Sequence, residues 1–255
     1  MIAHLAEIPA AGLAALIALL AAAAGLRLSV APHWARRLIP FSAGLLAGIA
    51  LLGILPELLR QQGCRGGLAF LATGLALLWA VGRWVYAVCP ACSHTHDHSL
   101  CAATLHGFAL PLVVAASLHA FLDGIGISAS GYGSGNTLAS AVLMGVGVHK
   151  IPEGLALGII LQAALGSPRA ALAWCVVVEA ATPLGAALES VVSARLGLSV
   201  VSLALGLAGG SFLYLAYHAI DAEWRQRGAA GVLPPVLAGI AAAALLQQGA
   251  DCWLH

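Results

Sequence analysis

Eight apolar runs, each close to the length of a membrane-spanning helix, constrain this chain more than any other feature. They occupy residues 10–28, 38–59, 66–88, 107–129, 136–163, 169–194, 198–220 and 231–248. A helix needs about 20 apolar residues to cross a bilayer. Only 8% of the residues are charged, whereas about 25% are charged in a soluble domain. The sequence therefore predicts an all-α integral membrane protein, an eight-transmembrane-helix bundle forming a single domain over residues 1–255.

The loop arginines are divided unevenly between the two sides of this expected bundle. One side holds Arg27, Arg36, Arg37, Arg83, Arg169, Arg225 and Arg227, and the other holds Arg60, Arg65 and Arg195. Because arginine and lysine are enriched in cytoplasmic loops, the first side is expected to be cytoplasmic. Both termini then lie outside, in a multi-pass protein of the cell membrane. The first run lacks a preceding basic segment, which favours a spanning helix over a cleaved signal peptide.

The net charge of +1 and the lack of a basic run give no support for a nucleic-acid partner. One expected cytoplasmic loop, residues 89–106 between spans three and four, is rich in metal-binding side chains. Its candidate ligands are Cys89, Cys92, His94, His96 and His98. Thiolates and imidazoles at this spacing suit Zn²⁺. Metal sensing or transfer, a non-essential chelating loop and a structural zinc knuckle all fit this pattern.

Two segments of the chain resemble each other. "LHAFLDGIGIS" (Leu118–Ser128) and "VHKIPEGLALG" (Val148–Gly158) share a histidine, an acidic residue four positions later and a glycine after it, with an offset of 30 residues. They fall in neighbouring spans, which run in opposite directions, so the two copies are expected to be inverted. Inverted repeats with polar groups near the middle of the membrane are typical of secondary transporters.

The repeated pairs predict a metal site between spans four and five. His119 and Asp123 are four residues apart, as are His149 and Glu153, and this spacing places both members of a pair on one helix face. Two facing pairs make a cage of two imidazoles and two carboxylates, which suits Zn²⁺ and also Fe²⁺, Mn²⁺, Co²⁺ or Cd²⁺. A single pair of this kind is equally compatible with hydrogen bonding between helices. The duplication favours the metal.

Pro152 lies between the candidate ligands of span five. A proline cannot donate the helical hydrogen bond, which frees the carbonyl group of Val148 and predicts a local kink. Freed backbone groups are tolerated in a bilayer where they are buried or line a cavity. The glycines that follow each acid permit close helix packing. Together these features predict two broken or bent helices around an ion path.

These motifs resemble those of the ZIP (Zrt/Irt-like) family of metal transporters. "HAFLDG" and "HKIPEG" are similar to the family's His-Asn-x-Pro-acid-Gly motifs. "AGLLAGIALLGILPELL" (Ala43–Leu59) and "GGSFLYLAYHAID" (Gly209–Asp221) resemble its second and seventh spans. The resemblance implies transport of Zn²⁺, or a related divalent ion, into the cytoplasm. It implies no cofactor beyond the transported ion, and it is compatible with a homodimer.

The chain departs from the family pattern at the positions associated with a second metal ion. Ala120 and Lys150 stand where the family has polar residues in spans four and five, and Thr182 stands where span six has a glutamate. Glu179, one turn before Thr182, is a further candidate acid. Gly53 replaces an acid or histidine in span two. These departures predict one transported metal instead of two.

Lys150 is the most unusual of these residues. Its ammonium group, next to Glu153 and Asp123, is predicted to take the place of a second cation. A structural ion pair between Lys150 and Glu179 is the alternative. His218 and Asp221, near the cytoplasmic end of span seven, are candidate exit ligands, although a solvated pair at the interface also fits.

Two other functions use similar residues. An intramembrane zinc-dependent hydrolase would need an open metal position with a bound water, and no further side chain clearly completes such a site. A metal exporter of the cation-diffusion type would also use paired His and Asp residues, but such proteins usually have six spans and a soluble domain. The inverted repeat and the eight runs favour an importer.

Overall fold

The structure is a computed structural model that describes residues 7–27, 35–85, 105–132, 136–196 and 198–253. These residues are helical almost throughout and contain no strand. The elements are α1 (Glu7–Gly25), α2 (Ala35–Gly48), the π-helical η2 (Ile49–Ile54), α3 (Leu55–Val85), α4 (Leu105–Ser130), α5 (Asn136–Leu165), α6 (Pro168–Leu196) and α7 (Leu198–Trp253). The all-α class expected from the sequence is confirmed.

Six segments are long and apolar enough to cross a membrane, and two of them are too long to cross only once. Arg37–Val81 has 45 residues and Ser199–Gln248 has 50. At 1.5 Å per residue each would extend more than twice the roughly 30 Å of a hydrocarbon core. Each segment contains a glycine with positive φ, Gly63 at 70° and Gly228 at 66°. Because only glycine adopts this conformation readily, these residues divide α3 and α7 into two arms each.

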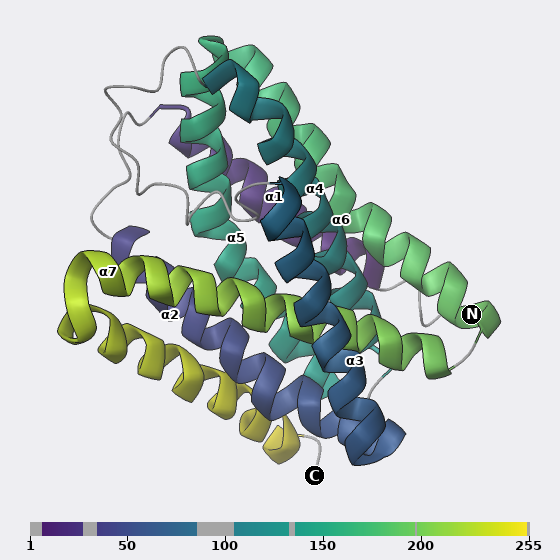
Figure 1. Ribbon diagram of the computed structural model, residues 1–255. Coiled ribbons are helices and arrows are strands. Elements are labelled where there is room, and N and C mark those ends of the chain that lie inside the picture. The colour runs from purple at the N-terminus through teal and green to yellow at the C-terminus, as the bar shows by residue number, and fades with distance from the viewer. Residues whose placement is uncertain (1–6, 28–34, 86–104, 133–135, 197, 254–255) are drawn as a thin grey trace.

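The described helices pack in two groups. α2 and α3 pack chiefly against α7, whereas α1 packs against α5 and α6, and α4 against α6. Figure 1 shows the two arms of α7 running in opposite directions, with α2 beside them. α5 contacts both groups. The helix that carries the motif "VHKIPEGLALG" therefore lies where the two groups meet.

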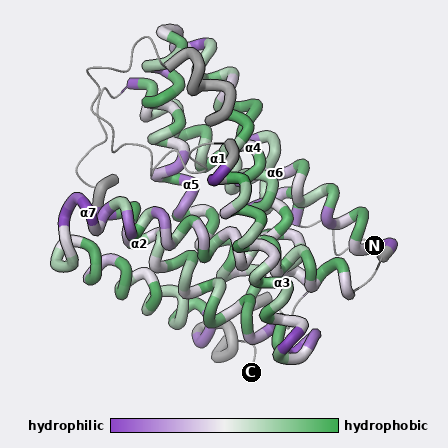
Figure 2. The backbone as a smooth tube through the Cα atoms, viewed as in Figure 1, coloured by the Kyte–Doolittle hydropathy of each residue, from purple (hydrophilic) through white to green (hydrophobic). Residues whose placement is uncertain are grey.

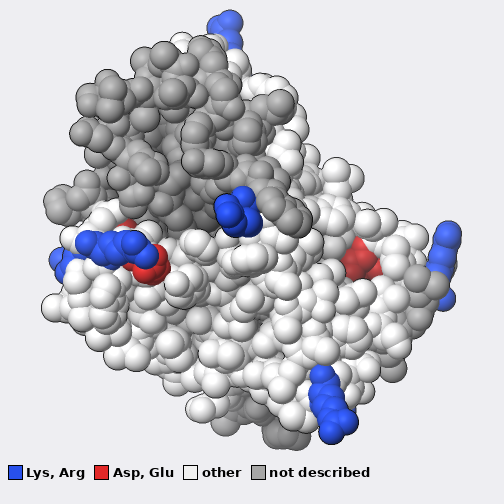
Figure 3. Space-filling model, viewed as in Figure 1, with Lys and Arg blue, Asp and Glu red and all other residues white. Residues whose placement is uncertain are grey.

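The surface agrees with a lipid environment. Hydrophilic residues gather where α3 and α7 turn, while most of the remaining described chain is apolar (Figure 2). In the face seen in Figure 3, most of the coloured surface is uncharged, and Lys and Arg side chains occupy only a few places on it. Large apolar side chains are exposed on the protein surface, for example Leu20, Leu184 and Leu245 at 63–67%. This pattern is expected where the solvent is lipid rather than water.

Two local features differ from expectation. α5 continues through Pro152 as one helix, so of the two expected forms, a broken or a bent helix, the broken one is not present; prolines are tolerated in spanning helices when neighbouring groups satisfy the freed backbone. The described part of α4 is likewise one helix. The irregular backbone is η2 instead, where the amide of Gln247, suitably oriented, donates to the carbonyl of Leu52 at 2.7 Å and accepts from the Gly53 N–H at 2.9 Å. Segments of this kind are frequent at functional sites.

α4 and α6 approach too closely for side chains at their crossing. A Cβ atom at Gly124 would collide with the backbone carbonyl of Thr182, and one at Gly185 with that of Phe121. We expect Gly124→Ala to lower the free energy of unfolding by about 1–3 kcal/mol, because the backbone must shift. Gly12→Ala is the matched control, since its Cβ would meet no atom within 4 Å. Equal melting temperatures of the two purified variants would contradict this packing.

Candidate metal centre

Three helices bring six polar side chains together in the interior of the protein. α4 supplies His119 and Asp123, α5 supplies His149, Lys150 and Glu153, and α6 supplies Glu179. None is more than 4% exposed. Ionisable groups inside a membrane protein are costly, and they persist where they pair, bind ions or line a pathway. The cluster therefore has the character of a functional site.

The two imidazoles and Glu153 form the compact part of the cluster. His119 Nε2 lies 3.3 Å from His149 Nε2 and 3.5 Å from Glu153 Oε2. One ligand atom from each of the three residues lies within 4.8 Å of the others. The Nδ1 atoms of both histidines make no hydrogen bond within the described residues. Both rings thus direct Nε2 toward the same point, as in a metal site with two nitrogen donors and one carboxylate donor.

Asp123 belongs to the cluster but stands apart from this group of three. Its Oδ2 atom lies 3.6 Å from His119 Nε2 and 3.1 Å from Lys150 Nζ. The side chain is therefore shared between an imidazole and the ammonium group. The sequence predicts Asp123 and Glu153 as equivalent ligands, whereas the geometry groups Glu153, and not Asp123, with both histidines.

Lys150 joins the three carboxylates of the cluster. Its Nζ atom lies 3.0 Å from Glu153, 3.1 Å from Asp123 and 3.1 Å from Glu179. The side chain is fully buried. Three carboxylates and one ammonium group carry a formal charge of −2 when the histidines are neutral. One divalent cation would balance this charge completely.

Further buried polar atoms line the cluster on the α6 side. Glu179 Oε1 and Thr182 Oγ1 make no hydrogen bond within the described residues, and both residues are fully buried. Unsatisfied buried oxygens are unusual in folded proteins and require an explanation such as an absent ion or water. The donor set as a whole, imidazole nitrogens with carboxylate oxygens, fits a borderline divalent metal.

The other sequence candidates do not join this cluster. His218 packs on the ring of Tyr214, with centroids 4.4 Å apart, and Asp221 pairs with Arg225 at 3.0 Å. Glu57 of α3, a further buried acid, is also outside the cluster and accepts a hydrogen bond from Arg60 at 2.6 Å. The loop candidates Cys89, Cys92, His94, His96 and His98 lie outside the described residues.

One further buried acid, outside the cluster, was not anticipated from the sequence. Glu189 of α6 is 4% exposed and accepts hydrogen bonds from Ser128 of α4, at 2.5 Å, and from Ser193. Glu179, Thr182, Glu189 and Ser193 recur at intervals of three to seven residues on α6, which is the periodicity of one helix face. This regular polar face was the signal available in the sequence. The hydroxyl groups of Ser128 and Ser193 thus satisfy the Glu189 carboxylate, and the bond from Ser128 links α4 to α6.

Comparisons with known proteins agree with the geometry. A family model described as "ZIP Zinc transporter" matches residues 88–223, which is more than half of the chain and includes all six cluster residues. Zinc transporter ZIP3 of Bos taurus is 31% identical over 137 residues. That alignment covers 51% of this chain and 43% of the relative, so it spans less than half of the relative's length. The resemblance drawn from the motifs is thereby confirmed, and the chain belongs to the ZIP zinc transporter family.

Proposed function

We propose that this chain moves Zn²⁺, or a related divalent ion, across the membrane into the cytoplasm through the cluster around His119, His149 and Glu153. The observation that carries this proposal is a buried cluster with metal-ligand geometry and a formal charge of −2. Such a site attracts a divalent cation strongly and becomes neutral when the cation binds.

The ligand set supports zinc as the substrate. Two imidazole nitrogens and one carboxylate oxygen are ordinary Zn²⁺ ligands, and zinc transport is the function named for the matching family and relative. Fe²⁺, Mn²⁺, Co²⁺ and Cd²⁺ accept the same donors. Family members are transporters and not enzymes, which argues against the alternative of an intramembrane hydrolase.

The topology of the transporter is part of the proposal. The division of α3 at Gly63 and of α7 at Gly228 supports eight membrane crossings. The matching motifs of α4 and α5 support an inverted repeat, and the arginine distribution supports outside termini in the cell membrane. A homodimer, a metal-binding role of loop 89–106 and an exit role of His218 and Asp221 remain proposals from the sequence.

Uptake into cells and into vesicles tests the function and its direction. Cells that express the chain should accumulate more radioactive zinc than control cells, because import raises the intracellular content. Proteoliposomes that contain the purified chain should take up zinc where empty liposomes do not. Reduced cellular zinc would identify an exporter instead, and vesicles without uptake would reject transport altogether.

A further inference from the structure

Lys150 contacts the same carboxylate oxygens that face the histidine side of the cluster. Among the described residues, Glu153 Oε2 lies 3.5 Å and Asp123 Oδ2 lies 3.6 Å from the Nε2 atom of His119. Both oxygens also lie close to the ammonium group of Lys150, at 3.0 Å and 3.1 Å respectively. The ammonium group therefore holds the oxygens that a metal ion beside the histidines would use.

A metal ion bound by one of these oxygens would lie close to the ammonium nitrogen. Zinc bonds to carboxylate oxygens are about 2.0–2.2 Å long. Because Lys150 Nζ is 3.0 Å from Glu153 Oε2, a zinc ion on that oxygen would lie at most about 5 Å from the nitrogen. Two like charges at this distance repel each other strongly in a buried site, where little water screens them. The ammonium group and the metal ion therefore compete for Glu153.

Glu179 gives the ammonium group a second position. Its Oε2 atom lies 3.1 Å from Lys150 Nζ, and the residue is not part of the compact group formed by the two histidines and Glu153. Lysine carries its charge on a flexible stem of four carbons. The ammonium group can therefore stay paired with Glu179 while it yields the Glu153 oxygen to a metal ion.

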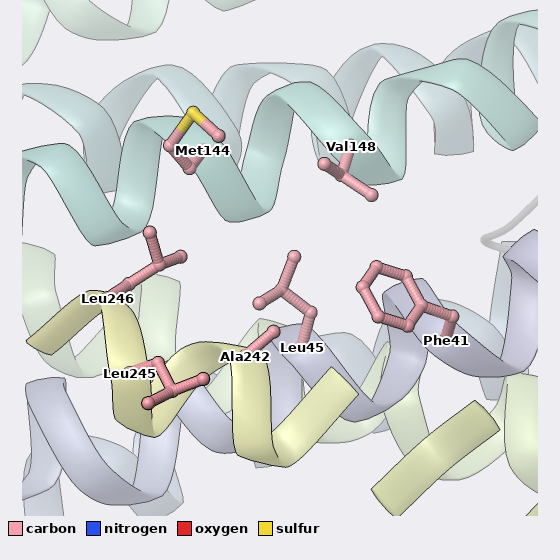
Figure 4. Close-up of a pocket in the computed structure, with 7 residues that line it drawn as sticks. All are labelled: Phe41, Leu45, Met144, Val148, Ala242, Leu245 and Leu246. Carbon is pink, nitrogen blue, oxygen red and sulfur yellow. The ribbon is translucent and has the colours of Figure 1, made fainter. Parts of the chain in front are cut away.

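The cavity beside this turn of α5 offers no side-chain ligand to the ion. An apolar groove of about 360 Å³ lies between α5 and the α2–α7 pair, and Val148, which directly precedes His149, forms part of its wall. Figure 4 shows the lining side chains, all of which are apolar. No side chain on that side competes with the cluster for the ion, so the competitor is found within the cluster itself.

A transport site must bind its ion strongly enough to load and weakly enough to unload. Two imidazoles and a carboxylate in a buried cluster of formal charge −2 favour loading. On the basis of the transport function proposed above, we propose that Lys150 promotes unloading. Its ammonium group moves from Glu179 back to Glu153 and displaces the ion, so the lysine lowers the affinity for the metal and accelerates its release.

The double variant Lys150→Leu/Glu179→Gln tests this role at constant charge. It loses one positive and one negative group, so the formal charge of the cluster stays at −2, and leucine offers no ligand atom. Loss of a hydrogen bond to a charged group changes an equilibrium constant by roughly 10–100-fold. We therefore expect zinc to bind the purified variant about 10–100-fold more tightly than the wild type. Its maximal uptake rate in proteoliposomes should fall at least about tenfold, because release becomes slow.

Glu179→Gln alone is the matched control. It shares one substitution with the double variant but keeps the ammonium group, which then pairs more closely with Asp123 and Glu153. Zinc should bind this variant more weakly than the wild type, and its maximal uptake rate should not fall as that of the double variant does. Tighter binding in the control than in the wild type would contradict competition by Lys150.

The wild-type protein permits a test without substitution. Lys150 is the only lysine in the sequence, so protein labelled with ¹⁵N at the lysine Nζ gives a single side-chain signal in nuclear magnetic resonance. Saturation with zinc should shift this signal, because the ammonium group leaves Glu153 and stays with Glu179. A signal that zinc does not change would overturn the proposal.

Two further results would overturn it. One is a double variant with the affinity of the wild type, and the other is tighter binding without slower maximal uptake. Both results leave the transport function itself intact. A wild-type protein that neither binds zinc nor takes it up into proteoliposomes would instead reject the transport function.

Discussion

Replacing Glu153 with glutamine is expected to reduce zinc uptake by at least roughly 100-fold. The carboxylate lies 3.5 Å from His119 Nε2 and 3.0 Å from Lys150 Nζ, so the substitution removes a metal ligand and leaves the lysine with less negative charge around it. Removing a residue that only hydrogen-bonds to a metal ligand lowers metal affinity or activity by about 10–100-fold, so the loss of a ligand itself should lower it at least as much. Uptake by proteoliposomes at matched protein content measures the effect.

Glu189→Gln is the matched control for this experiment. Glu189 is also a buried carboxylate in a spanning segment, but its partners are Ser128 and Ser193 rather than the histidines. Its variant should retain most of the uptake. Asp123→Asn should fall between the two, because Asp123 is 3.6 Å from His119 and outside the group of three. A Glu153→Gln protein as active as Glu189→Gln would refute the site.

Much of this arrangement follows from local sequence patterns. The apolar runs locate the spanning segments because membrane crossing requires a minimum apolar length. Spacing of four residues places His149 and Glu153 on one face of α5, and this relation holds for any straight helix. These rules depend only on helix geometry, and the all-α class follows from them; the structure also brings the six polar residues of spans four to six together.

Other features depend on packing between helices, which spacing does not encode. Asp123 and Glu153 occupy equivalent positions in the repeat and both contact Lys150, yet only Glu153 lies in the compact group with the two histidines. η2 is held by Gln247, nearly 200 residues away in the chain. The link between Ser128 and Glu189 likewise forms only once α4 and α6 cross. Each of these three features can be predicted only when it is known which helices lie next to each other.

Lys150→Asn is expected to raise the number of divalent ions bound by the cluster from one to two. Without the ammonium group, Asp123, Glu153 and Glu179 carry a formal charge of −3, which one divalent ion leaves uncompensated. Burying that excess charge in a spanning bundle is costly, and the asparagine oxygen adds a ligand near the three acids. Equilibrium binding to purified protein, with metal content counted per chain, measures the change.

Charge restoration separates this explanation from a merely structural role of Lys150. The double variant Lys150→Asn/Glu179→Gln returns the formal charge to −2 and should again bind one ion, even though it has lost the ion pair between the two residues. If Lys150 served only to hold Glu179, Lys150→Asn would destabilise the protein without binding an additional metal. One bound ion in Lys150→Asn, with the metal preference of the unmodified chain, would therefore show that the lysine does not stand in for a second cation.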